Sequence, residues 1–336
     1  MRSKNNRVVR KLQFLNNFLM KIAFLQGFSP KKCKTVREPT GFPNKSNNYP
    51  WLIIFLYIVV FSGCSSAPKN AGEIYVDRNM AIQQLNLANQ TLSRGRYDDA
   101  LRILGEARRL AVSSDDPYLR LRTSISRGDI LFSLGRHEEA FSEWDSASYE
   151  GDSTGEPVLA SLARIFAIRA RLILLANETD AGTAAAAAEE LKAQANREMA
   201  VVRNDDLSSA AAYVALGLAE KQLGRWAEAE TAVRRALDIH ERSGALEDSA
   251  YDWFLIASIR SVAGNYNGAL EALRSAISFD RRSENGFGLA SSWQAVGDVN
   301  QKAGRLQDAG DAWRRAAEIY RAIGLSSYAE RIESQL

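Results

Sequence analysis

Residues 222–230 read QLGRWAEAE, and four related segments recur along the chain. These segments are 93–101 (SRGRYDDAL), 133–141 (SLGRHEEAF), 262–270 (VAGNYNGAL) and 302–310 (KAGRLQDAG). Their central glycines are separated by 40, 89, 40 and 40 residues. A fixed period of this length is typical of a repeat protein, and the interval of 89 residues leaves room for one divergent unit.

The same residue types surround the glycine in all five segments. The turn glycines themselves are Gly95, Gly135, Gly224, Gly264 and Gly304. A bulky residue lies two positions later, at Tyr97, His137, Trp226, Tyr266 and Leu306. Alanine lies five positions after the glycine, at Ala100, Ala140, Ala229, Ala269 and Ala309, and again twelve positions after it. A small residue lies seven positions before it, at Ala88, Gly128, Gly217, Ala257 and Gly297.

These positions predict a pair of packed helices in each unit. The glycine is expected to end the first helix, because glycine tolerates the left-handed backbone of a helix terminus. The small residues allow the two backbones to approach closely, and the bulky residue two positions after the glycine is expected to fill the space between the helices. Because one pair cannot bury its apolar face alone, the units are expected to stack around a continuous core.

The pattern of small residue, glycine, bulky residue and two alanines resembles that of the tetratricopeptide repeat family. The resemblance covers residues 81–114, 121–154, 210–243, 250–283 and 290–323. It implies an all-α fold, a right-handed α-solenoid of about six helix–turn–helix pairs over residues 74–336. The period of 40 residues exceeds the roughly 34 usual in the family, which predicts longer helices or longer loops.

The third unit, residues 157–202, lacks the turn glycine and admits two interpretations. It is either a decayed repeat that still fills its place in the stack, or a kink with a specialised contact. Residues 326–336 are expected to form a capping helix, because Ser327-Tyr328-Ala329-Glu330 has the form of a capping box. Its polar side chains would cover the last apolar face, as the end of a solenoid requires.

In the resembled family, the first helix of each pair lines a concave groove that accepts a peptide or a partner helix. Carried over position by position, the resemblance places these residues in the groove: Leu85, Asn89, Leu92, Ile125, Asp129, Phe132, Val214, Leu218, Lys221, Tyr251, Phe254, Leu255, Ser258, Gln294, Asp298 and Gln301. The apolar cluster Tyr251, Phe254 and Leu255 is a candidate anchor; the alternative is that it packs against a neighbouring unit or the cap. Leu85 replaces the lysine with which chaperone-binding members clamp a carboxylate, so that ligand is not expected.

The first 63 residues have the character of a leader peptide. The apolar run 51–63 (WLIIFLYIVVFSG) has the length of a signal-peptide core and is too short to span a membrane as a helix. The following stretch Phe61-Ser62-Gly63-Cys64 resembles the bacterial lipobox, in which the cysteine is lipidated and becomes the mature N-terminus. Phe61 departs from the leucine usual there, and an uncleaved anchor or a plain secretory signal remain alternatives. The leader is long, which makes Met20 a candidate start.

The resemblance to lipoproteins implies a chain anchored through Cys64 in a bacterial cell envelope. Residues 64–73 would be a linker, and Cys33 would be removed with the leader. Ser65 follows the cysteine where an aspartate would retain the protein at the inner membrane, which favours the outer membrane. The periplasmic and external faces both remain open.

Charge and composition exclude several functional classes. Residues 1–63 hold 11 of the 43 basic and one of the 40 acidic residues, so 64–336 hold 32 basic and 39 acidic residues. Such an acidic body is not expected to bind nucleic acid. The chain contains no recognisable catalytic, metal or cofactor motif, and we expect neither an enzyme nor a cofactor. His137 is expected to pack in the repeat, and His240 to interact with a helix dipole.

Together these features predict a membrane-anchored scaffold that binds a protein or peptide in its groove. Two alternatives remain open at this point. The first is a surface-exposed lipoprotein that acts as an adhesin and contacts host or external molecules. The second is a periplasmic carrier of a small ligand.

Overall fold

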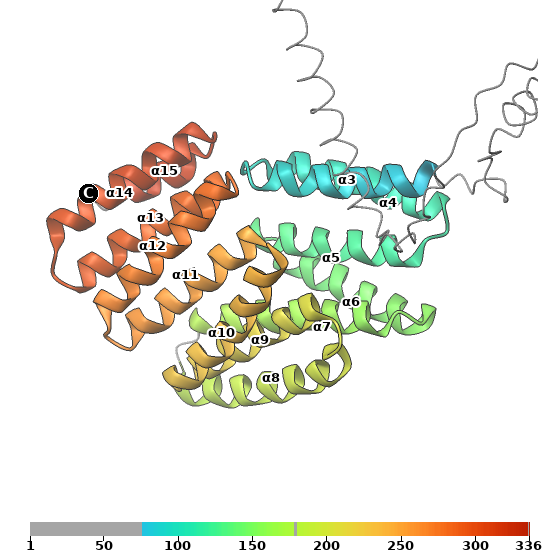
Figure 1. Cartoon of the computed structure of the whole chain (residues 1–336), viewed down its shortest axis with the longest axis horizontal. Coiled ribbons are helices and arrows are strands. Elements are labelled where there is room, and N and C mark those ends of the chain that lie inside the picture. The colour runs from blue at the N-terminus through green and yellow to red at the C-terminus, as the bar shows by residue number, and fades with distance from the viewer. Residues whose placement is uncertain (1–75, 178–179, 335) are drawn as a thin grey trace, which may run out of the picture. The chain divides into compact units, whose positions relative to one another are not determined.

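The computed structural model of the chain describes residues 76–177, 180–334 and 336. The leader 1–63, the linker 64–73 and Cys64 lie outside these residues. The described residues form thirteen α-helices and one short 3-10 turn, and they contain no strand (Figure 1). None of the described helices has the length and apolar character needed to cross a membrane. The expected all-α fold is therefore confirmed.

The helices form six consecutive pairs and a terminal helix. The pairs are α3 (Val76–Leu92) with α4 (Tyr97–Ser113), α5 (Pro117–Ser133) with α6 (His137–Thr154), α7 (Pro157–Leu174) with α8 (Ala181–Val202), α9 (Asp206–Gln222) with α10 (Trp226–Ser243), α11 (Leu246–Val262) with α12 (Tyr266–Arg282), and α13 (Gly286–Lys302) with α14 (Leu306–Ala322). The terminal helix is α15 (Ser326–Glu333), and the 3-10 turn Leu175–Asn177 follows α7.

The pairs stack as an α-solenoid. The second helix of each pair packs against the first helix of the next pair, and α5, α7 and α9 also pack side by side (Figure 1). The third pair, α7 and α8, occupies the place between the second and fourth pairs, although α8 is 22 residues long. Each turn glycine ends its first helix in the left-handed region, with φ of 72° at Gly95 and 80° at Gly264.

Within a pair, the small residue of the first helix faces a residue of the second helix that lies nine positions after the turn glycine. A Cβ atom added at Gly128 would lie 2.4 Å from Nε1 of Trp144, and one added at Gly297 would lie 2.3 Å from Trp313. The Trp144 indole donates a hydrogen bond of 3.2 Å to the Ile125 carbonyl, which fixes the ring over Gly128. The two helices can approach this closely only because a side chain is missing from one of them.

The sequence predicted that the bulky residue two positions after the turn glycine fills this space. In the structure it does not do so in every pair. Trp226 is 37% exposed and Leu306 is 70% exposed, each at the first residue of its helix. The residue seven positions later lies two turns along the same helix face, and there Trp313 is buried. The filling role therefore belongs to the later position.

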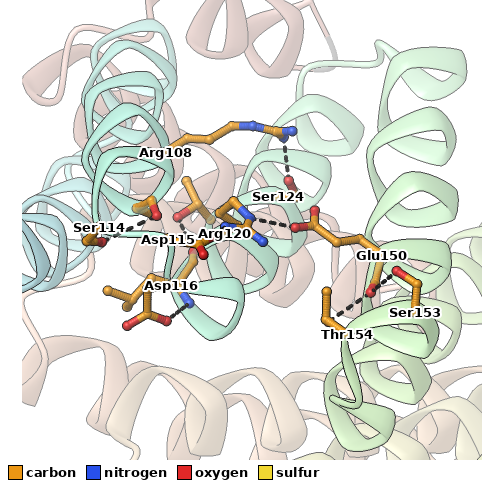
Figure 2. A network of polar contacts seen from close by, with 12 residues as sticks. Arg108, Ser114, Asp115, Asp116, Arg120, Ser124, Glu150, Ser153 and Thr154 are labelled. Atoms are coloured by element: carbon orange, nitrogen blue, oxygen red, sulfur yellow. Dashed lines mark hydrogen bonds and ion pairs between the residues drawn. The ribbon is translucent and has the colours of Figure 1, made fainter.

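A network of charged and polar side chains joins the first two pairs (Figure 2). The Arg120 guanidinium donates hydrogen bonds to Glu150 at 2.6 Å and to Asp115 at 3.0 Å. Arg108 donates to the Ser124 hydroxyl at 2.6 Å. The Asp116 carboxylate caps α5 by accepting from the Leu119 amide at 3.0 Å. These bonds span three successive helices, α4, α5 and α6.

The first pair also contacts the last one. The Tyr97 and Phe287 rings, 190 positions apart in the chain, pack edge to face with their centroids 5.7 Å apart. Phe287 packs in turn against Tyr320 and Tyr328. A Cβ atom at Gly95 would lie 3.0 Å from the Leu325 side chain. The two ends of the solenoid therefore meet through these side chains.

The close approach within a pair predicts opposite effects of two glycine-to-alanine substitutions. Gly128→Ala forces Trp144 out of its place and should lower the free energy of unfolding by about 1–3 kcal/mol. Gly105→Ala, in α4, meets no atom within 4 Å and should raise it by about 0.5–1 kcal/mol through helix propensity. Urea denaturation of both variants measures this difference. Equal stabilities would contradict the assigned contact.

Candidate functional site

The inner face of the solenoid is hollowed by an open cavity of about 510 Å³, which we call the inner cavity. First helices from pairs two, three, five and six contribute most of its walls. Residues that define it are Asp129 and Phe132 on α5, Phe166 and Arg169 on α7, Asp248 and Tyr251 on α11, and Phe287 on α13. The cavity therefore joins residues far apart in the chain, as expected of a binding site formed by stacked repeats.

Arg169 lies between two aromatic rings of the inner cavity. Its guanidinium carbon is 4.9 Å from the centre of the Phe166 ring and 5.6 Å from the centre of the Tyr251 ring. Burial alone lowers the pKa of Arg169, but Tyr251 and Asp129 more than offset this and raise it above its usual value. The guanidinium thus remains charged and connects α7 to α11 across the cavity.

Asp129 is a carboxylate without a direct partner. It is open to the water of the cavity, yet the surrounding protein raises the pKa of its carboxyl, and Arg169 offsets only part of that effect. Among the described residues, no hydrogen bond or ion pair reaches this carboxylate. It also lies near the C-terminal end of α5, where the helix dipole disfavours negative charge.

A second hollow of about 270 Å³, the side pocket, adjoins the inner cavity and shares Tyr251 and Phe287 with it. Phe254 and Ala250 contribute further apolar walls. At its base Asp280 is 2% exposed. Because the two hollows share Tyr251 and Phe287, they together make up the candidate site.

The Asp280 carboxylate accepts hydrogen bonds of 3.1 Å from the Ser292 hydroxyl and 3.1 Å from the Asn285 amide. Burial raises its pKa to about 7, and the nearby Glu247 carboxyl adds to the increase, since the two hydrogen bonds only partly offset burial. Asp280 therefore changes its charge near neutral pH, at the base of the side pocket.

The structure brings four of the predicted groove residues to these hollows. Asp129, Phe132 and Tyr251 line the inner cavity, and Tyr251 and Phe254 line the side pocket. The remaining predicted residues lie elsewhere. The structure places Val214, Leu218, Leu255 and Ile125 in the hydrophobic core, Leu85 and Leu92 against the core of the first pair, and Asn89, Gln294 and Gln301 outside both hollows.

Two further predicted groove residues bind neighbouring helices. The Lys221 ammonium donates to the Ser258 hydroxyl at 2.8 Å, and burial lowers the pKa of that lysine. The Asp298 carboxylate accepts from the Trp313 indole at 2.9 Å. The first contact joins α9 to α11 of the next pair, and the second joins α13 to α14 within the sixth pair.

Sequence reasoning missed Phe166, Arg169 and Phe287. No groove position was assigned to the third pair, because it has no turn glycine with which to align it to the other repeats. A different signal was present: Pro117 and Pro157 begin α5 and α7, and they are 40 residues apart. The same shift of 40 residues relates Asp129 to Arg169. Phe287 lies in the first turn of α13, three positions before the range assigned to the last repeat.

The two histidines lie at helix contacts. The His240 imidazole and the Asp252 carboxylate are 2.6 Å apart and connect α10 to α11. Burial lowers the pKa of His240, but the bond and charge of Asp252 outweigh burial and raise it. His137 packs against Phe132, with the ring centroids 4.8 Å apart. The contact of His240 with Asp252 was not foreseen from the sequence.

Residues 209–243, which form the fourth pair, match the sequence model of the tetratricopeptide repeat family. This match confirms the resemblance to that family, whereas the resemblance to lipoproteins stays a prediction. No curated relative matches the chain.

Several solved structures resemble the fold. BtubC from P. vanneervenii has 16% identity and a TM-score of 0.45, over 72% of this chain and 92% of that protein. A Rap protein complexed with competence and sporulation factor has 14% identity and a TM-score of 0.48, over 79% and 76%. A thermophilic TPR protein of Thermus thermophilus has 19% identity and a TM-score of 0.45, over 63% and 98%.

The raised pKa of Asp280 predicts a stability that depends on pH. Because the folded chain holds this proton more tightly than the unfolded chain, the protonated carboxyl stabilises the fold below about pH 4. That contribution is lost as the pH rises to about 7. In Asp280→Asn the side chain cannot ionise, and its amide can maintain both hydrogen bonds if the Ser292 hydroxyl accepts. The fall in Tm between pH 5 and pH 8 should therefore shrink by about 5 °C.

Thermal unfolding followed by circular dichroism at both pH values measures this effect. The exposed Asp145, on α6, offers the matched control. Asp145→Asn should leave the pH dependence of Tm as it is in the unmodified chain. An unchanged pH dependence in Asp280→Asn would show that this carboxyl does not titrate in the folded range.

Proposed function

We propose that this chain is a protein-interaction scaffold that binds a peptide segment of its partner on the inner face of the solenoid. The observation that carries the proposal is the inner cavity, whose walls come mainly from four first helices and include five aromatic side chains. Aromatic side chains in an enclosed site are the usual anchors of protein recognition. The tetratricopeptide repeat at residues 209–243 supports the same class of function.

We also propose that the scaffold is tethered to a bacterial cell envelope. The support is the order of sequence features: a basic leader, the apolar run 51–63, then Cys64 and a short polar linker. Lipidation of Cys64 would hold the chain at a membrane surface. The outer membrane is the membrane that Ser65 favours.

A carrier of a small ligand is the second candidate function. The inner cavity has a volume of about 510 Å³, which falls in the range of about 300–1,000 Å³ typical of small-molecule sites. A carrier would show a bound small molecule in native mass spectrometry and would select no peptides.

Filling the inner cavity should abolish peptide binding. Ser133 lines the cavity at the end of α5 and is exposed, so Ser133→Trp adds a large ring without disturbing the core. Peptides selected from a random library on the full chain should bind Ser133→Trp at least about tenfold more weakly. Isothermal titration calorimetry measures the affinities.

Ser153→Trp is the matched control, because Ser153 is also exposed and its hydroxyl also donates to a backbone carbonyl of its own helix, but it lies outside the cavity. It should bind the selected peptides as the unmodified chain does. If Ser133→Trp bound them equally well, the inner face would not be the binding site.

Substitution of Cys64 tests the tether. In a bacterial host fed an alkyne-labelled fatty acid, the full chain should incorporate the label and Cys64→Ser should not, because the thiol is the acylation site. Cys33→Ser should incorporate it normally, since that residue is removed with the leader. Gel fluorescence after click labelling reads the result, and label retained in Cys64→Ser would exclude lipidation at this residue.

A further inference from the structure

The candidate site carries more acidic than basic groups. Four carboxyl groups line the inner cavity and side pocket: Asp129, Asp248, Glu247 and Asp280. Arg169 is the cation among the residues that line the two hollows. A recessed site with this excess of acidic groups attracts positive charge, because interactions between charges strengthen where water is partly excluded.

Arg169 does not neutralise this excess. Its guanidinium is held between the Phe166 and Tyr251 rings, and it forms no ion pair with Asp129 within the described part of the chain. Asp248 lies in the first turn of α11, where the helix dipole offers partial compensation. Asp129 lies at the unfavourable end of α5 and has no such compensation. It is therefore the group that gains most from an added cation.

The walls around Asp129 also suit a cation. The Phe132 and Phe287 rings line the same cavity and remain partly exposed, beside the other aromatic rings that pack against them. A guanidinium or ammonium group over an aromatic face gains roughly 0.5–2 kcal/mol. The carboxylate and the rings thus favour the same chemical group, a positive charge on an apolar stem.

The side pocket adds an adjacent apolar subsite. Ala250, Phe254 and the shared rings of Tyr251 and Phe287 line it. A ligand that reaches from one hollow into the other must pass these two shared rings. Neighbouring residues of an extended peptide could occupy the two hollows in this way.

We propose that the bound peptide places an arginine or lysine side chain in the inner cavity beside Asp129, and the apolar side chain of an adjacent residue in the side pocket. This inference rests on the proposed function and names the chemistry of its ligand. An acidic side chain drawn to Arg169 is the opposite possibility. It is disfavoured because it would enter a cavity that Asp129 and Asp248 already line.

Three acetylated, fluorescein-labelled octapeptides test the proposal: Gly-Ser-Ala-X-Leu-Ala-Ser-Gly amides with arginine, glutamine or glutamate at X. With the full chain, fluorescence anisotropy should give the arginine peptide an affinity at least about tenfold above that of the glutamine peptide, and the glutamate peptide should bind most weakly. Asp129→Asn should reduce the preference for arginine over glutamine to less than about threefold. Asp248→Asn should reduce it by a smaller factor.

Asp145→Asn is the matched control, because it removes the same charge from an exposed site outside both hollows. It should keep the full preference, which separates a contact in the cavity from the general field of an acidic protein. Equal affinities for the arginine and glutamine peptides, tighter binding of the glutamate peptide, or no binding of any of them would overturn the inference. The proposed function has its own test. It would fail if library peptides of every charge bound the Ser133→Trp variant as tightly as they bind the unmodified chain.

Discussion

The two helices of a repeat approach each other as closely as a missing side chain allows. Where Gly128 faces Trp144 and Gly297 faces Trp313, there is no room for a Cβ atom, and Gly217 faces Val233 in the same way. This close approach sets the geometry of each pair and hence how the next pair can stack on it. Such pairs, stacked one on the next, build the solenoid.

Much of this fold was predictable from the repeated residues. The small residues and turn glycines recur at fixed intervals, and their roles follow from sterics alone. The identity of the filling residue was not predictable in this way. Trp226 and Val233 lie seven residues, or about two turns, apart on one helix face, so periodicity cannot tell which of them enters the space beneath. The contact with Gly217 shows that it is Val233.

The site was predictable only in part, for a related reason. Asp129, Phe132, Tyr251 and Phe254 were found because each lies at a set distance from its turn glycine. Val214 and Leu255 occupy related positions but are buried, since the winding of the solenoid presses these helix faces into the largest core cluster. Arg169 lies across the cavity from Tyr251, 82 positions away, and no local pattern reports a contact over that separation. Such contacts depend on the winding of the whole stack.

The meeting of Tyr97 with Phe287 bears on how such a protein can evolve. An open solenoid gains or loses a repeat by duplication or deletion with little cost, because each unit contacts only its neighbours. Here a seventh pair, or a lost one, would separate the two rings and leave Leu325 away from Gly95. The number of repeats is thus set by geometry, and the divergent third pair could change its sequence but could not be discarded.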